Sequence, residues 1–232
     1  MARYTSPYGD YLQRTREVEL LVSKAKALER KNAVGNGFEI ATLCRASIVL
    51  LSSHLEGYVK DLGELTASRI VSRSVPRSRL DDRFFYHLSK SHFEKLRETA
   101  DPAKLAKQHF AFLSQDAQLW DRTGPFPTPL PYDRFAKGFA TPSVDKIYKF
   151  LGRFGVVGIR GLMQAHLRHD YVATITMIDN IVNTRNNIAH GDAVLTKTPT
   201  DVTEMFNYAK AFIRSTDVVF ADWCSANLCT IR

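Results

Sequence analysis

The chain has 232 residues, of which 44% are hydrophobic, so we expect one sizeable packed domain and exclude general disorder. Lys and Arg number 32 against 24 Asp and Glu, and the resulting charge of +8 favours an acidic partner, nucleic acid before a membrane surface. Three cysteines without zinc-site spacing, a start without a signal-peptide core and a longest apolar run of only IVLL (48–51) predict a cytoplasmic protein with free thiols, no metal and no membrane partner.

Apolar residues recur at helical spacing in the first third of the chain, and no alternating strand pattern occurs in the sequence. The spacing predicts an amphipathic helix over 8–32, which ends at the glycines of VGNGF, 34–38. A second helix is predicted over about 39–72. It is apolar enough to form the buried centre of the domain.

An arginine-rich connector, RIVSRSVPRSRLDDR, follows at 69–83. Its guanidinium groups are candidates to bind RNA phosphates, because neutralising phosphate charge supplies much of the affinity for nucleic acid. A solvated connector without a ligand explains them as well and is the preferred interpretation. The candidate RNA contacts are Arg69, Arg73, Arg77 and Arg79.

The middle of the chain is predicted to mix short helices with loops. In chain order, these are helices at about 81–99 and 102–119, the second capped by Asp101-Pro102, a proline-rich extended loop at 124–132, a short helix after Ser143 and a glycine-rich turn region at 152–161. We therefore predict that residues 1–232 form a single all-α bundle, in which 69–142 are an insertion or elaboration.

Two further helices complete the prediction. The first covers 170–190 and has a stripe of isoleucine and valine side chains. The second covers about 201–228, with Asp201 and Glu204 placed as a capping box.

The sequence NTRNNIAHGD, 183–192, lies where the first of these helices ends. Asn186 and His190 are four residues apart and share a helix face. Arg185 and His190 are five apart, about 140° around an ideal helix, so they do not share one. Arg185 instead continues the apolar stripe, where a cation needs a partner or a wet groove. His190 and Gly191 suit a helix C-terminus, so a simple cap also explains the stretch.

The same side chains would support the cleavage of RNA without a metal. Histidine transfers protons near neutral pH, and arginine binds a phosphate and stabilises its developing charge. A base that takes the proton of the 2′-hydroxyl would allow its oxygen to attack the adjacent phosphate.

RNNIAH, from Arg185 to His190, resembles the R-x4-6-H motif of HEPN ribonucleases, including the polar residue that usually follows the arginine. RASIVLLSSHLEGYVKDL, 45–62, resembles the earlier long helix of the RiboL-PSP and MAE-type HEPN families, with an acidic residue at Glu56. The resemblance covers roughly residues 38–192.

This resemblance implies an HEPN-type helical bundle and a homodimer whose two motifs meet in one cleft. It also implies metal-independent endoribonuclease activity without a cofactor, in a toxin–antitoxin or phage-defence setting, with an antitoxin or another regulatory protein as a further partner. Arg185 would bind the phosphate, His190 would act as general base or acid, and Asn186 would orient one of them. Glu56 would support Arg185, or it is a solvated carboxylate that pairs with Lys60 at i+4.

Two other interpretations stay open. A non-catalytic HEPN module would bind RNA or a partner protein without cutting, and a plain helical scaffold would do neither.

Overall fold

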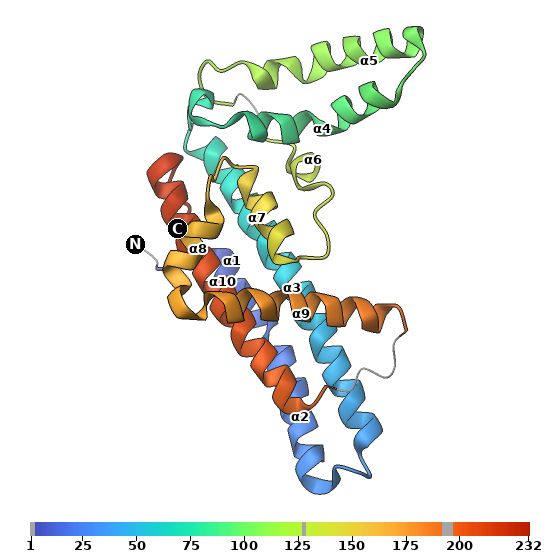
Figure 1. Ribbon diagram of the computed structural model, residues 1–232. Helices are drawn as coiled ribbons and strands as arrows, with labels where there is room; N and C mark the ends of the chain where they lie inside the picture. Colours follow the sequence, from blue (N-terminus) through green and yellow to red (C-terminus); the bar gives the residue numbers. More distant parts are fainter. Residues whose placement is uncertain (1–2, 127–128, 192–196) are drawn as a thin grey trace.

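The structure is a computed structural model that describes residues 3–126, 129–191 and 197–232, and within these ranges it contains helices and no strands. Figure 1 shows an elongated molecule in which long helices run side by side and a helical hairpin lies across one end. The prediction of an all-α fold is confirmed.

The N-terminal part forms two helices where the sequence predicted one over 8–32. α1 spans Ser6–Arg14 and α2 spans Arg16–Asn32, with Thr15 between them. α2 buries Val18, Val22 and Ala25, which are spaced at three and four residues and therefore share one face. The separation at Thr15 lies inside a continuous apolar pattern, so periodicity alone does not reveal it.

α3, Gly37–Ser72, is the central helix and contacts α1, α2, α9 and α10. Its side chains Leu51, Leu55 and Leu62 are fully buried. Among the described helices, α3 alone is long and apolar enough to cross a membrane by length and composition, with a mean hydropathy of 1.3 over 18 residues. The core helix of a bundle meets the same criterion, and α3 occupies that position.

The connector after α3 leads through the 3-10 turn η1, Arg77–Arg79, into a helical hairpin. The hairpin consists of α4, Asp82–Glu98, and α5, Pro102–Gln115, followed by the 3-10 turn η2, Ala117–Trp120. Asp101 accepts hydrogen bonds from the N–H groups of Ala103 and Lys104, so the predicted cap of α5 is confirmed.

A cluster of aromatic rings joins the hairpin to the bundle. The ring of Phe84 on α4 lies 5.1 Å from that of Phe135 and 5.9 Å from that of Phe154, and all three are buried. These residues belong to the same continuous hydrophobic core as α3 and α10. Residues 69–142 thus share a core with the rest of the chain, and their origin as an insertion stays a prediction.

Three helices follow the proline-rich loop: α6, Tyr132–Ala136, α7, Val144–Gly152, and α8, Ile159–Leu167. Ser143 caps α7 as predicted, since its side chain accepts the N–H of Lys146. The sequence did not predict α8, because the recurring glycines indicated turns. Gly155 and Gly158 do adopt positive φ angles of 105° and 71°, and α8 begins directly after them.

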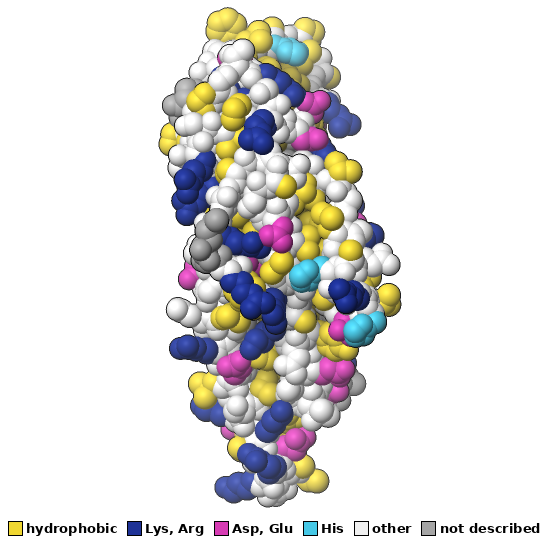
Figure 2. All heavy atoms as spheres, turned by 90° about the vertical axis from the view of Figure 1, so that its left-hand side faces the viewer, with side chains coloured by type: hydrophobic (Ala, Val, Ile, Leu, Met, Phe, Trp, Pro, Cys, Tyr) yellow, Lys and Arg dark blue, Asp and Glu magenta, His cyan; other side chains and the backbone are white. Residues whose placement is uncertain are grey.

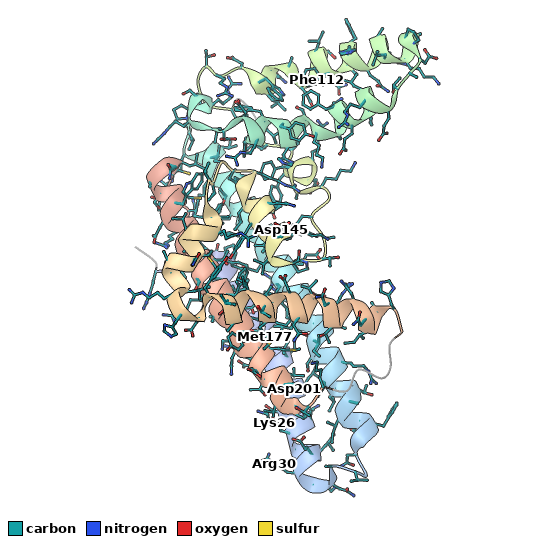
Figure 3. The ribbon with its side chains drawn as sticks, in the orientation of Figure 1. Lys26, Arg30, Phe112, Asp145, Met177 and Asp201 are labelled. Carbon is teal, nitrogen blue, oxygen red and sulfur yellow. The ribbon has the colours of Figure 1, made fainter. Side chains whose placement is uncertain are left out.

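After the 3-10 turn η3, Arg168–Asp170, α9 spans Tyr171–Ala189 and α10 spans Pro199–Asn227. The capping box of α10 consists of Thr198 and Asp201, not the predicted Asp201 and Glu204. The helix begins two residues earlier than expected because Pro199 suits its first position. Figure 3 shows Asp201 at the start of α10, on the side of α2 that carries Lys26.

Candidate active site

The side chain of Arg185 continues the buried face of α9. This face is formed by Tyr171, Thr174, Ile178 and Ile181, each less than a tenth exposed. Arg185 comes four residues after Ile181 and is half-buried. The predicted position of an arginine at the end of an apolar stripe is therefore confirmed.

Main-chain groups provide the cap of α9. The N–H of His190 donates to the carbonyl oxygen of Asn186 at 3.0 Å, and the N–H of Gly191 donates to that of Ile188 at 3.2 Å. Gly191 has a φ of 87°, the left-handed conformation that favours glycine at a helix C-terminus. Both donors are backbone N–H groups, so these capping hydrogen bonds do not involve the imidazole of His190.

Arg185, Asn186 and His190 lie at the C-terminal end of α9. Figure 1 shows α9 crossing α3 and α10, with its C-terminal end extending beyond α3. His190 is exposed, Asn186 is half-buried, and the Nη1 atom of Arg185 lies 3.4 Å from the Oδ1 atom of Asn186. This arrangement presents a cation and a proton-transfer group to solvent. An ideal helix separates Arg185 and His190 by about 140°, so one chain presents them in different directions.

Glu56 lies in the middle of α3, and its carboxylate contacts other groups than Arg185. Its Oε1 atom lies 2.6 Å from Nζ of Lys60, and its Oε2 atom accepts the N–H of Thr141 at 3.2 Å. Among the ion pairs of the described residues, Glu56 pairs with Lys60, which agrees with the second of its two predicted interpretations. Glu56 therefore gives Arg185 no direct support in this structure.

The role of the loop that Glu56 holds was not predicted from the sequence. Thr141 has a φ of 57°, a left-handed conformation that a β-branched residue rarely adopts. Three residues later, the N–H of Val144 donates to Oδ1 of Asp179 on α9 at 2.9 Å. Two carboxylates, one on α3 and one on α9, thus fix this loop across both helices. The sequence feature that could have indicated this contact is the carboxylate of Asp179 within an otherwise apolar helix.

Arg77 is buried in the connector and is 6% exposed. Its guanidinium donates to the carbonyl oxygens of Gln118 at 2.7 Å and Gly124 at 3.3 Å, and to that of Thr123. It also contacts the carboxylate of Asp121 at 3.2 Å. These acceptors occupy the guanidinium, so the structure gives Arg77 neither the RNA contact nor the solvated position that the sequence suggested.

The other three candidate RNA contacts, Arg69, Arg73 and Arg79, lie near the C-terminal segment. Burial raises the pKa of the Cys229 thiol, and the charges of Arg73, Arg69 and Arg79 act in the opposite direction. The structure thus brings these arginines to one place, at the end of α3. That end lies away from the C-terminal end of α9 (Figure 1), so they are separate from Arg185.

The positive charge is spread over the surface drawn in Figure 2. Lys and Arg side chains are scattered along the length of this face, with Asp and Glu among them. In the three described ranges, no group of three or more His, Cys, Asp or Glu side chains is placed to hold a metal ion.

The all-α fold agrees with the HEPN class that the sequence resembles. The family model RiboL-PSP-HEPN matches residues 10–222. The chain therefore belongs to the RiboL-PSP-HEPN family. Membership indicates a ribonuclease or an RNA-binding module, since HEPN domains are often ribonucleases. No curated protein and no solved structure matches the chain significantly.

Proposed function

We propose that this protein is a metal-independent endoribonuclease whose catalytic residues are Arg185 and His190. The observation that carries the proposal is the end of α9. There, backbone hydrogen bonds complete the helix cap, the half-buried guanidinium of Arg185 contacts Asn186, and the imidazole of His190 is exposed. In an HEPN protein, these are the two groups that cleavage of RNA requires.

The proposed reaction is a transesterification within the RNA. The imidazole of His190 takes the proton of the 2′-hydroxyl, and the resulting oxygen attacks the adjacent phosphorus. Arg185 binds the phosphate oxygens and stabilises the charge that develops on them. The bond from phosphorus to the 5′-oxygen breaks, and that oxygen receives a proton from a general acid. The products are a 2′,3′-cyclic phosphate and a 5′-hydroxyl.

The proposed active form is a homodimer in which the C-terminal ends of two α9 helices face one cleft. Each chain presents its arginine and histidine in different directions, and a two-fold axis would bring Arg185 of one copy toward His190 of the other. The second histidine would then supply the general acid. Asn186 is proposed to orient Arg185, because their side chains are in contact.

The biological setting is proposed from family membership alone. A cytoplasmic toxin or phage-defence effector, held inactive by an antitoxin or another regulatory protein, agrees with this activity. Arg69, Arg73 and Arg79 are proposed as secondary phosphate contacts outside the catalytic cleft.

A denaturing gel tests the activity directly. Purified protein is incubated with mixed RNA in EDTA, beside the variants Arg185→Ala and His190→Ala and the matched control Asn187→Ala, which changes an exposed neighbour. We expect cutting by the wild type and the control, and none by the other two variants, with unchanged circular dichroism in all four. Cutting by both variants would refute the site. Intact RNA with a mobility shift would instead support the non-catalytic binding module.

Light scattering tests the dimer. At micromolar concentration in the presence of uncleavable RNA, we expect the mass of two chains of 26.3 kDa plus that of the bound RNA. A monomer under these conditions would contradict the shared cleft.

A further inference from the structure

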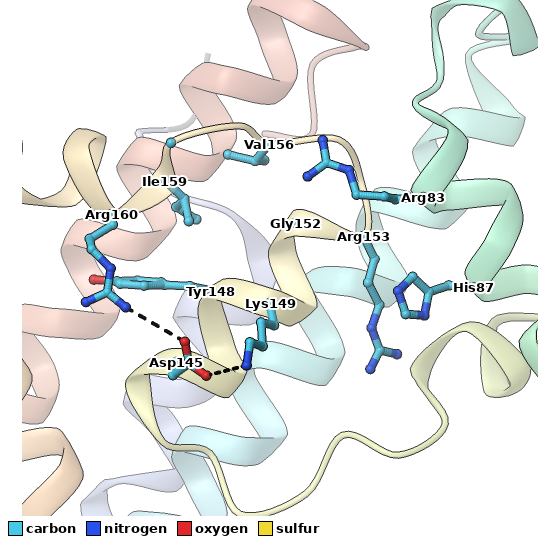
Figure 4. Close-up of a pocket in the computed structure, with 11 residues that line it drawn as sticks. Arg83, His87, Asp145, Tyr148, Lys149, Gly152, Arg153, Val156, Ile159 and Arg160 are labelled. Atoms are coloured by element: carbon cyan, nitrogen blue, oxygen red, sulfur yellow. Dashed lines mark ion pairs between the residues drawn. The ribbon is translucent and has the colours of Figure 1, made fainter.

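A cavity of about 370 Å³ lies between α4, α7 and the beginning of α8 (Figure 4). It is formed by the middle of the chain and contains none of the residues proposed for RNA cleavage. Its volume lies within the range of small-molecule sites in proteins. The cavity is therefore a candidate for a ligand other than the nucleic acid at α9.

Basic side chains from three helices line this cavity. Arg83 and His87 come from α4, Lys149 from α7, Arg153 from the position directly after α7, and Arg160 from α8. In Figure 4, Arg83 and Arg160 lie on opposite sides of the cavity, with Lys149 and Gly152 between them.

The nearby carboxylates neutralise only part of this charge. Asp145 lies 2.7 Å from Nζ of Lys149 and 3.8 Å from Nη2 of Arg160, and Asp81 lies 2.7 Å from Nε of Arg83. The guanidinium of Arg153 donates to the carbonyl oxygens of Phe135 and Lys137, so three cations face these two carboxylates. His87 lies at the edge of this charge: burial lowers its pKa to about 4, and the charges of Arg153 and Lys90 act in the same direction.

The first turn of α8 adds backbone donors to the same cavity. Gly158 caps this helix without a side chain, in the left-handed conformation, and no acidic residue occupies the first turn. The positive end of the helix dipole and the uncapped N–H groups favour a bound anion. The aromatic ring of Tyr148 lies under Arg160, whose Cζ is 5.6 Å from the ring centroid, and Val156 and Ile159 complete an apolar floor.

We propose that this cavity binds the phosphate monoester of a small organic molecule. The phosphate would lie between Arg83, Lys149 and Arg160 at the first turn of α8, because a dianion with three acceptor oxygens uses several convergent donors. The organic part would lie against Tyr148, Val156 and Ile159. The proposal is independent of RNA cleavage, since it concerns different residues and a different part of the fold.

His87 supplies a direct readout of binding. An anion placed near the imidazole favours its protonated form, so its pKa rises. The experiment is an NMR pH titration of the histidine ring protons of the full-length His190→Ala protein, with and without ribose 5-phosphate or AMP. Ribose and adenosine serve as the neutral controls, and the variant His87→Gln assigns the signal.

We expect both phosphates to raise the pKa of His87 and the neutral compounds to leave it unchanged. Arg160→Ala and Lys149→Ala should weaken AMP binding at least tenfold. Both side chains are mainly exposed, at 60% and 77%, so these variants should fold. The matched control is Lys146→Ala, an exposed lysine on α7 whose Nζ donates to the carbonyl oxygen of Ala140. The proposal is wrong if the phosphates leave His87 unchanged or if the control weakens binding as much as Arg160→Ala.

A phosphate monoester can belong to a free metabolite or to the 5′ end of a nucleic acid. A 5′-phosphorylated DNA trinucleotide, which has no 2′-hydroxyl to attack, distinguishes the two. Binding of AMP and ribose 5-phosphate alone identifies a free metabolite, and tighter binding of the trinucleotide identifies the end of a nucleic acid. Because the protein carries His190→Ala throughout, failure here does not bear on RNA cleavage, and failure of RNA cleavage does not bear on this site.

Discussion

The Nη1 atom of Arg185 lies 3.4 Å from the Oδ1 atom of its neighbour Asn186, so the two side chains touch at the end of α9. The distance is at the long end for a hydrogen bond, and the contribution of this contact is correspondingly modest. Asn186 nevertheless limits the directions in which the guanidinium can point. We therefore propose that Asn186 positions Arg185.

Asn186→Ala should slow RNA cutting about tenfold, equivalent to about 1.4 kcal/mol of transition-state stabilisation, and leave RNA binding nearly unchanged. Arg185→Ala should slow it by about 100-fold or more. Single-turnover rates at saturating protein measure both. Equal losses in Asn186→Ala and the control Asn187→Ala would contradict the positioning role.

Glu56→Ala should lower the free energy of unfolding by about 1–2 kcal/mol and preserve cutting, because the carboxylate holds the N–H of Thr141. Urea denaturation followed by circular dichroism, together with the cleavage assay, measures the two effects. Lys60→Ala is the control for the ion pair and should change stability by less than about 1 kcal/mol. Lost cutting at unchanged stability in Glu56→Gln would favour the alternative interpretation, in which Glu56 supports Arg185.

Arg77→Ala should lower the free energy of unfolding by about 3 kcal/mol, because it removes a buried guanidinium together with its hydrogen bonds to the carbonyl oxygens of Gln118, Thr123 and Gly124. Arg79→Ala removes an exposed arginine two residues away and should stay within about 0.5 kcal/mol. Chemical denaturation compares the two variants. A similar small effect of both would show that the buried guanidinium is dispensable.

The unfolding free energy should fall between pH 7 and pH 5, with a contribution from His87. The folded protein holds the pKa of His87 at about 4, mainly through burial, whereas an unfolded chain has a histidine pKa of about 6.5. The stability that this histidine contributes is fully present above the unfolded pKa. It is lost as the pH falls from there toward 4, because the unfolded state takes up a proton that the folded state resists.

His87→Gln should therefore show a smaller loss of stability between pH 7 and pH 5 than the wild type. His169→Gln changes a histidine whose side chain is 87% exposed and should retain the wild-type pH profile. Urea midpoints at the two pH values measure the difference. Identical profiles for His87→Gln and the wild type would contradict the assignment.

The sequence was sufficient to predict the long helices α3 and α9 and the position where α9 ends. Apolar spacing predicts α3 and α9 because each buries a continuous face, and Arg185 is predictable as the next position of the stripe on α9. Gly191 predicts the left-handed cap because that conformation favours glycine. Each of these features depends on residues a few positions apart.

Contacts between distant segments were not predictable in the same way. Besides Lys60, Glu56 contacts a backbone N–H 85 residues later, and the acceptors of Arg77 lie 41 to 47 residues away. No local pattern specifies such pairs. α8 was not predicted because Gly158, its N-cap, belongs to a series of glycines typical of turns. In the structure, the left-handed conformation of Gly158 ends the turn, and the helix begins at the next residue.

The chemical ends of the products test most directly whether Arg185 and His190 cleave RNA through its own 2′-hydroxyl. The measurement is mass spectrometry of the fragments of a defined RNA cut in EDTA, beside the same RNA with one 2′-deoxy substitution at the cleavage position. We expect a 2′,3′-cyclic phosphate on the upstream fragment, a 5′-hydroxyl on the downstream fragment and no cutting at the substituted position. A 5′-phosphate on the downstream fragment, or efficient cutting at the 2′-deoxy position, would contradict the mechanism.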